Sequence, residues 1–166
     1  MIEVSHLTKR YGAHLAVSDL SLNIEDGQIY GFLGPNGAGK STTMNIMTGC
    51  LAASSGEVRI DGHDIFEESG AAKRLLGYLP EQPPLYMDRT PREYLTFVGR
   101  AKGLSRSQLA EQMERVMSVP QIGDVADRLI KNLSKGHLPR AGIAPDLLGD
   151  PELVLLHAPP VGLVHR

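Results

Sequence analysis

The sequence predicts an α/β fold in which a mainly helical block separates two parts that contain strands. Apolar residues at every second position indicate strands near the start of the chain. A glycine-rich turn then joins a short apolar run to a helix-like stretch around residue 40. Two helix-start signals lie between residues 90 and 130, ahead of a last aliphatic run at 152–156. Strands on both sides of a helical block are typical of an α/β core with a helical lobe.

The first elements are two strands with period-two alternation. Ile2 and Val4 alternate with polar residues, and so do Leu20, Leu22 and Ile24. We therefore expect one face of each strand to be buried.

The glycine-rich turn is flanked by a predicted strand and a predicted helix. Residues 28–33 (QIYGFL) follow an Asp-Gly turn signal and are mostly apolar, which predicts a buried central strand. After the turn, Met44, Met47, Cys50 and Leu51 recur at helical spacing. These four residues predict the apolar face of a helix, with Cys50 in the core.

A short strand, helix and strand are expected next. Residues 57–60 are strand-like, and Asp61-Gly62 is a strong hairpin signal. A short helix over residues 67–75 should lead into a strand at 76–79.

The helical block begins with two capping boxes. Thr90, Pro91 and Glu93 combine an N-cap residue, a first-turn proline and a capping-box glutamate. Ser105 and Gln108 repeat the signal for a second helix. The apolar stripe of that helix consists of Leu109, Met113, Val116 and Met117.

Composition excludes several classes of protein. The 166 residues suffice for one ordinary domain. A net charge of −2 argues against a nucleic-acid partner, which would require a basic surface. One cysteine excludes an intramolecular disulfide framework and fits a reducing compartment. The chain shows neither a secretory signal nor a stretch of about 18 apolar residues, so we expect any membrane role to work through a partner.

Residues 34–41 (GPNGAGKS) satisfy the pattern G-x-x-x-x-G-K-[ST]. Backbone N–H groups converge on a polyphosphate only if the loop adopts left-handed conformations, which we expect at Gly34, Gly37 and Gly39. The following helix adds its N-terminal N–H groups. An ordinary strand-to-helix turn is the alternative, but the flanking run and helix favour nucleotide binding.

Two side chains of this loop have chemistry that suits a nucleotide. Lys40 would reach the β and γ phosphates, and Ser41 would hold Mg²⁺ through its hydroxyl. A nucleoside triphosphate and Mg²⁺ are therefore the expected ligand and cofactor.

Four segments together resemble the ATP-binding subunit of an ABC transporter of the exporter type. They are LTKRYG at 7–12, GFLGPNGAGKSTTM at 31–44, LGYLPEQPPLYMDRTPREYL at 76–95 and LSKG at 133–136. The resemblance implies a P-loop NTPase (RecA-like) core with N-terminal antiparallel strands and a helical ABC-specific lobe. We expect a single domain over 1–166, C-terminally incomplete, with its core at 1–84 and 145–166 and its helical lobe at about 85–144.

The resemblance also implies roles for individual residues. Tyr11 would stack on adenine, although packing at a strand end is an alternative. In the loop that senses the γ-phosphate and coordinates Mg²⁺ or water, Glu81 is favoured over Gln82. The ATP-binding residues would be Tyr11, Gly34, Pro35, Asn36, Gly37, Ala38, Gly39, Lys40, Ser41 and Thr42. The signature segment, which would contact ATP bound to a second subunit, is Leu133, Ser134, Lys135 and Gly136.

The end of the chain departs from the family pattern. His157 and Ala158 stand where an Asp-Glu pair is expected, and Pro160 and Val164 replace Thr and Asp. Imidazole is a poor ligand for Mg²⁺, and alanine cannot orient a water molecule. The expected catalytic pair is therefore not intact.

The segment after the signature conflicts with the helix that the resemblance implies. Pro139 and Pro145 would each remove a hydrogen bond from a helix interior, and Asp146 stands where an apolar or small residue would suit better. The departures cluster after residue 136, which suggests a decayed gene, a fragment or a sequence error.

Two functions remain open. The chain is either the ATP-hydrolysing component of an exporter or a nucleotide-binding subunit that does not hydrolyse ATP. In both cases the expected partners are a membrane-spanning subunit and a second nucleotide-binding subunit. The expected location is cytoplasmic, at the inner face of the cell membrane. A phosphate-loop kinase is a third, weaker alternative.

Overall fold

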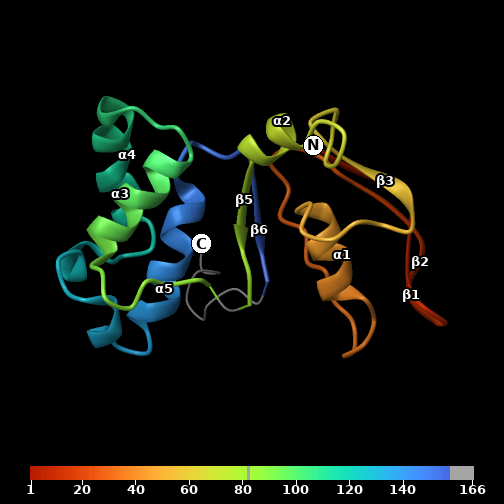
Figure 1. The fold of residues 1–166 in the computed structure, drawn as a ribbon, viewed down its shortest axis with the longest axis horizontal. Helices are drawn as coiled ribbons and strands as arrows, with labels where there is room; N and C mark the ends of the chain where they lie inside the picture. Colours follow the sequence, from red (N-terminus) through yellow and green to blue (C-terminus); the bar gives the residue numbers. More distant parts are fainter. Residues whose placement is uncertain (82, 158–166) are drawn as a thin grey trace. The chain divides into compact units, whose positions relative to one another are not determined.

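The computed structural model describes residues 1–81 and 83–157, and it divides into two compact units, Met1–Leu76 and Gly77–Arg166 (Figure 1). The expected boundaries of a core and a helical lobe differ from this division and stay a prediction. Among the described residues no helix is long and apolar enough to cross a bilayer.

The first unit is built on an antiparallel sheet of order β2-β1-β3-β4. Its strands are β1 (Ile2–Tyr11), β2 (His14–Ile24), β3 (Ser55–Ile60) and β4 (His63–Asp64). Ile2 and Val4 of β1 are buried beside Ile60 and Val58 of β3, their register partners. The predicted alternation and the N-terminal antiparallel strands are thus confirmed.

The predicted hairpin turn at Asp61 and Gly62 is also confirmed. Ile60 pairs with His63 directly across the two-residue loop. Both turn residues have a positive φ, 49° at Asp61 and 80° at Gly62. This matches the type I′ turn, whose twist suits neighbouring antiparallel strands.

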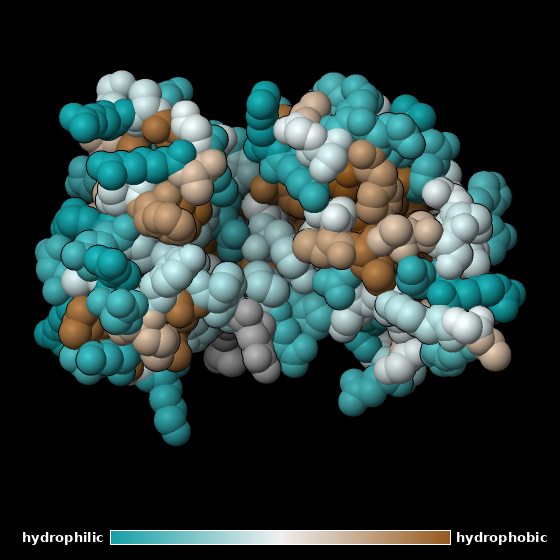
Figure 2. Space-filling view, in the orientation of Figure 1, coloured by the Kyte–Doolittle hydropathy of each residue, from teal (hydrophilic) through white to brown (hydrophobic). Residues whose placement is uncertain are grey.

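The predicted central strand at residues 28–33 is wrong. The segment has no strand conformation, and Ile29 and Leu33 are 101% and 93% exposed. A strand forms only where a neighbouring strand supplies backbone hydrogen bonds. Both edges of β1 are already occupied by β2 and β3, and no strand of this sheet pairs with residues 28–33. The apolar run therefore lies open on the first unit, whose drawn face carries apolar side chains (Figure 2).

Two helices complete the first unit: α1 (Lys40–Met47) and α2 (Ser69–Arg74). The predicted apolar face of α1 is partly wrong, because its buried residues are Thr43, Ile46 and Met47. The helix ends before Cys50, which is exposed. The predicted apolar face included Cys50 and Leu51, which follow the end of the helix.

The second unit pairs β5 (Leu76–Leu79) with β6 (Leu153–Leu156) and packs helices on one side of the pair (Figure 1). Its apolar core is formed mainly by the helices and includes Leu95, Val116, Ile122 and Leu148. The helices are α3 (Pro91–Ala101), α4 (Arg106–Ser118), α5 (His137–Ile143) and the 3-10 helices η1 (Gly123–Val125), η2 (Ile130–Asn132) and η3 (Ala144–Leu147).

Both predicted capping boxes are present. Thr90 Oγ1 accepts the Glu93 backbone N–H at 3.2 Å, and the Glu93 carboxylate accepts the Thr90 N–H at 3.0 Å. Ser105 and Gln108 make the same exchange at 3.3 and 2.9 Å. Each box satisfies two N–H groups that a helix start leaves without partners, which fixes where α3 and α4 begin.

The two prolines were expected to conflict with a helix after the signature segment. The segment instead forms two short helices, α5 and η3, in place of one long helix. Pro139 is the third residue of α5, where its missing N–H removes no hydrogen bond within the helix. Pro145 falls in the first turn of η3. The prediction that both prolines disrupt a helix interior is therefore wrong.

Candidate functional site

The phosphate loop, residues 34–41, leads into the N-terminus of α1. Gly37 and Gly39 have φ values of 84° and 81°, which confirms the expected left-handed conformation at these two residues. The same expectation for Gly34 is wrong, because its φ is not positive. At Gly34 a Cβ would lie 3.4 Å from that of Ala38, which is ordinary contact.

Gly39 fixes the loop against the sheet of the first unit. A Cβ at this residue would lie 2.3 Å from the Ala16 carbonyl oxygen of β2. The Gly39 carbonyl accepts the Thr43 backbone N–H at 2.8 Å and its hydroxyl at 2.9 Å. Only glycine allows both this close approach and the positive φ.

Lys40 folds back over the loop from the first residue of α1. Its Nζ donates to the carbonyl oxygens of Gly34 at 2.6 Å and Pro35 at 2.7 Å. The Ala38 backbone N–H donates to Pro35 at 3.2 Å. The ammonium group therefore lies beside the turn of the loop, in reach of an anion bound there. The rest of the segment is open: Asn36, Gly37, Ala38 and Ser41 are exposed and Thr42 is half-buried.

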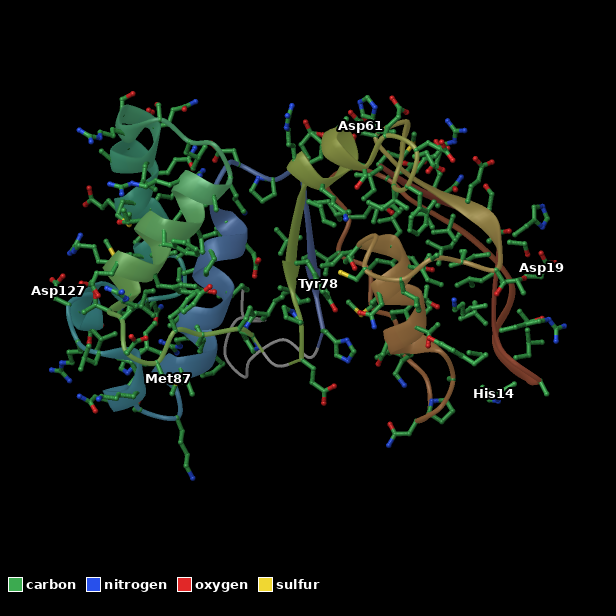
Figure 3. The ribbon with its side chains drawn as sticks, viewed as in Figure 1. His14, Asp19, Asp61, Tyr78, Met87 and Asp127 are labelled. Carbon is green, nitrogen blue, oxygen red and sulfur yellow. The ribbon has the colours of Figure 1, made fainter. Side chains whose placement is uncertain are left out.

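Tyr11 lies at the end of β1 and is 49% exposed. It pairs with His14 of β2, which is labelled in Figure 3. Two residues beyond His14, Ala16 contacts the phosphate loop at Gly39. The sheet register therefore brings the tyrosine and the loop to the same end of the sheet. Both roles considered for Tyr11, stacking on adenine and packing at a strand end, stay predictions.

Sequence reasoning missed the side chain that accompanies Tyr11. Lys9 Nζ lies 5.2 Å from the centre of the tyrosine ring and donates to the Ala52 carbonyl at 2.7 Å. A cation at this distance interacts favourably with an aromatic face. The alternation of residues in β1 could have indicated the pair, because residues two apart share a face of a strand.

Glu81 and His157 meet where β5 and β6 end. The His157 backbone N–H donates to the Leu79 carbonyl at 3.0 Å. Its Nε2 lies 3.7 Å from a Glu81 carboxylate oxygen. Glu81, which is expected in the sensing loop, thus contacts the residue at the position of the expected aspartate. Gln82, Ala158, Pro160 and Val164 lie outside the described residues.

The signature segment lies between η2 and α5 in the second unit. Leu133 packs against the apolar core, whereas Ser134, Lys135 and Gly136 are exposed. Ser134 Oγ lies 2.9 Å from His137 Nδ1, and His137 Nε2 lies 4.0 Å from Asp124 Oδ2. An exposed Ser and Gly at this turn fit a contact with a second molecule.

Asp146 is a half-buried carboxyl group of the second unit. Burial raises its pKa to about 7, although the charge of Lys102 and a backbone hydrogen bond from Tyr78 favour the ionised form. Lys102 Nζ donates to the carbonyls of Pro145 and Leu148, each at 2.9 Å, and burial lowers the pKa of this ammonium. The expectation that an apolar or small residue would suit this position better agrees with the burial.

The sequence model of the family described as "ABC transporter" matches residues 17–159, so the chain belongs to this family of ATP-binding cassettes with a P-loop NTPase fold. It is 35% identical to the ABC transporter ATP-binding protein YxlF of Bacillus subtilis (strain 168), over 96% of this chain and 52% of that protein. It is 36% identical to the daunorubicin/doxorubicin resistance ATP-binding protein DrrA of Streptomyces peucetius, over 99% of this chain and 50% of the relative. The chain thus spans about half the length of these curated relatives.

Solved structures agree with the family. The ATP-binding subunit of an ABC transporter has a TM-score of 0.86 and 27% identity, covering 97% of this chain and 67% of the other. A dimeric ATP-binding cassette in a post-hydrolysis state, bound to ADP and Pi, has a TM-score of 0.80 and 25% identity. That comparison covers 94% of this chain and 73% of the other.

Proposed function

We propose that this chain is the ATP-binding component of an ABC exporter and acts on a separate membrane subunit. The observation that carries the proposal is the phosphate loop, in which left-handed Gly37 and Gly39 surround a turn that Lys40 covers. Relatives named for Nod factor export and for drug resistance support the exporter assignment. The membrane subunit would place the chain at the inner face of the membrane.

In this proposal Lys40 exchanges the carbonyls of Gly34 and Pro35 for phosphate oxygens. The exchange is favourable because a phosphate oxygen carries charge, whereas a carbonyl carries a partial charge. Backbone N–H groups of the loop and of the start of α1 would bind the remaining oxygens. Tyr11 would stack on the base, with Lys9 held beside its ring.

The residues of the loop fit Mg²⁺. This ion retains waters and binds through one or two protein oxygens together with substrate phosphates. Ser41 offers a hydroxyl oxygen in the first turn of α1, which suits that limited requirement. Bound with the nucleotide, the ion would neutralise phosphate charge. Among the residues that the structure describes, no group of three or more His, Cys, Asp or Glu side chains could hold a metal on its own.

A second copy, or a related subunit, would supply the signature segment. Ser134 and Gly136 would face the nucleotide held by the partner, and the partner's segment would face the nucleotide of this chain. The dimeric cassette among the structural relatives supports such an assembly. Closure of the pair on ATP would then act on the membrane subunit.

A second candidate function is nucleotide binding without hydrolysis. It is favoured by the contact between His157 and Glu81, which lies where the family resemblance implies an aspartate for Mg²⁺. Ala158 in the next position cannot accept a proton from water. In this form the chain would be the silent half of an asymmetric pair.

Calorimetry with ATP and the full chain tests nucleotide binding. We expect Lys40→Ala to weaken binding by at least tenfold, since hydrogen bonds to charged groups contribute about 1.5–3 kcal/mol. Lys131→Ala, an exposed lysine outside the loop, is the matched control and should bind ATP as the parent does. Equal affinity of the parent and Lys40→Ala would remove the proposal.

Phosphate release separates the two candidate functions. Magnesium-dependent release above background by the chain, alone or with its membrane subunit, supports the hydrolysing form. ATP binding without release supports the silent form.

A further inference from the structure

Ser134, His137 and Asp124 form a line of polar groups in the second unit. Ser134 Oγ lies 2.9 Å from His137 Nδ1 and accepts the His137 backbone N–H at 3.2 Å. On the far side of the ring, Nε2 lies 4.0 Å from Asp124 Oδ2. A serine hydroxyl has one donor and two lone pairs, so the imidazole determines which of these remains for an outside ligand.

The protonation state of Nδ1 determines whether the Ser134 hydroxyl can donate its hydrogen to an outside ligand. If Nδ1 lacks a proton, the hydroxyl donates to it, and one lone pair remains. If Nδ1 carries a proton, it donates to Oγ, and the backbone N–H occupies the other lone pair. The hydroxyl hydrogen then points away from the ring. Because fully ionised phosphate oxygens only accept, only this second state offers them a donor.

In the neutral ring, Asp124 favours the first state. A carboxylate beside Nε2 stabilises a proton on that nitrogen, and a neutral imidazole carries only one N–H. Lys135 and Arg140 are the charged residues on the same segment, and Arg140 donates to Gln121 Oε1 at 3.1 Å. Among the described residues, Asp124 is the charged side chain of another element that lies 4.0 Å from this ring.

We propose that His137 is a positioning residue that holds the Ser134 hydroxyl hydrogen inward and so weakens the contact of the signature segment with a nucleotide phosphate. The inference rests on the proposed function, in which that segment faces a nucleotide on a second subunit. It gives a chemical role to a residue that neither the phosphate loop nor the sensing loop involves.

A double-mutant cycle on the full chain tests this role. ATP-dependent self-association, measured by sedimentation, should become about tenfold tighter in His137→Phe, which keeps a ring and removes Nδ1. In the Ser134→Ala background, the same substitution should change association less than twofold, because the hydroxyl is gone. An equal change in both backgrounds would show a merely structural role and overturn the proposal.

Nuclear magnetic resonance of the imidazole nitrogens decides the proposal without any nucleotide. At a pH where the ring is neutral, we expect an unprotonated Nδ1 and a protonated Nε2 in the parent chain. Asp124→Ala should increase the fraction with a protonated Nδ1. A protonated Nδ1 in the neutral ring of the parent would overturn the proposal. A chain that shows no ATP binding in calorimetry refutes the proposed function instead.

Discussion

His157 Nε2 lies 3.7 Å from the carboxylate of Glu81, across the ends of two paired strands. The histidine side chain is 18% exposed and the glutamate side chain 73%. The imidazole is therefore largely buried, whereas the carboxylate lies at the surface. Both residues belong to segments that resemble the hydrolytic machinery of ABC ATPases. The carboxylate of Glu81 therefore already contacts a side chain of the same chain.

Replacing His157 and Ala158 together should raise the rate of ATP hydrolysis. His157→Asp with Ala158→Glu supplies the acidic pair that the family resemblance implies, and a positioned base contributes about 10²–10⁴-fold in rate. We expect phosphate release to rise at least 10²-fold over that of the parent chain. His157→Asp alone is the control and should give a much smaller increase. No difference between the double and single variants would show that Ala158 does not limit the rate.

Asp146 should make the chain less stable as the pH rises. Its pKa is raised from 3.8 to about 7, so between these values the folded chain holds a proton that the unfolded chain releases. The stability that the protonated group contributes is complete below pH 4 and is lost as the pH rises to 7, by about 4 kcal/mol. Asp146→Asn should remove most of this decline in urea unfolding. Asp88→Asn, at an exposed aspartate, should leave the pH dependence unchanged.

Truncation of Ile29 should hardly change stability. The side chain is 101% exposed, so Ile29→Ala should alter the free energy of unfolding by less than about 0.5 kcal/mol. Ile46→Ala, at a fully buried residue of the same unit, should cost about 2–5 kcal/mol. Equal costs for the two variants, measured by urea unfolding, would show that residues 28–33 are buried after all.

The two left-handed glycines of the phosphate loop should respond differently to alanine. At Gly37 an added Cβ meets nothing within 4 Å, so Gly37→Ala bears only the conformational cost of about 1–2 kcal/mol. At Gly39 the Cβ would lie 2.3 Å from a β2 carbonyl, so the loop must move away from the sheet. We expect a clearly larger loss of stability and of ATP affinity in Gly39→Ala. Similar unfolding midpoints for both variants would contradict the close packing.

Local signals predicted much of this structure because they act within a few residues. The capping boxes at Thr90 and Ser105 and the turn at Asp61 are determined by neighbours along the chain, and all three are confirmed. The strand predicted at residues 28–33 is wrong because a buried strand depends on partners that are distant in sequence. The apolar composition of the run could not reveal whether such a partner pairs with it.

The candidate site also combines local features that the sequence predicted with contacts between segments that it did not. The motif at residues 34–41 predicted the loop, and two of its three expected left-handed glycines are confirmed. Contacts between separate segments, such as Lys9 with Tyr11 and Glu81 with His157, were visible only in the fold. Asp146 was marked as unsuited to its position, but its shifted pKa depends on burial that the sequence does not display.

The ammonium of Lys40, resting on the carbonyls of Gly34 and Pro35, means that the loop is closed by a charge of its own. An arriving anion competes with main-chain oxygens for that cation, and its success depends on how much negative charge it brings. We therefore expect such a loop to discriminate among nucleotides by the number of their phosphates before any contact with the base is made.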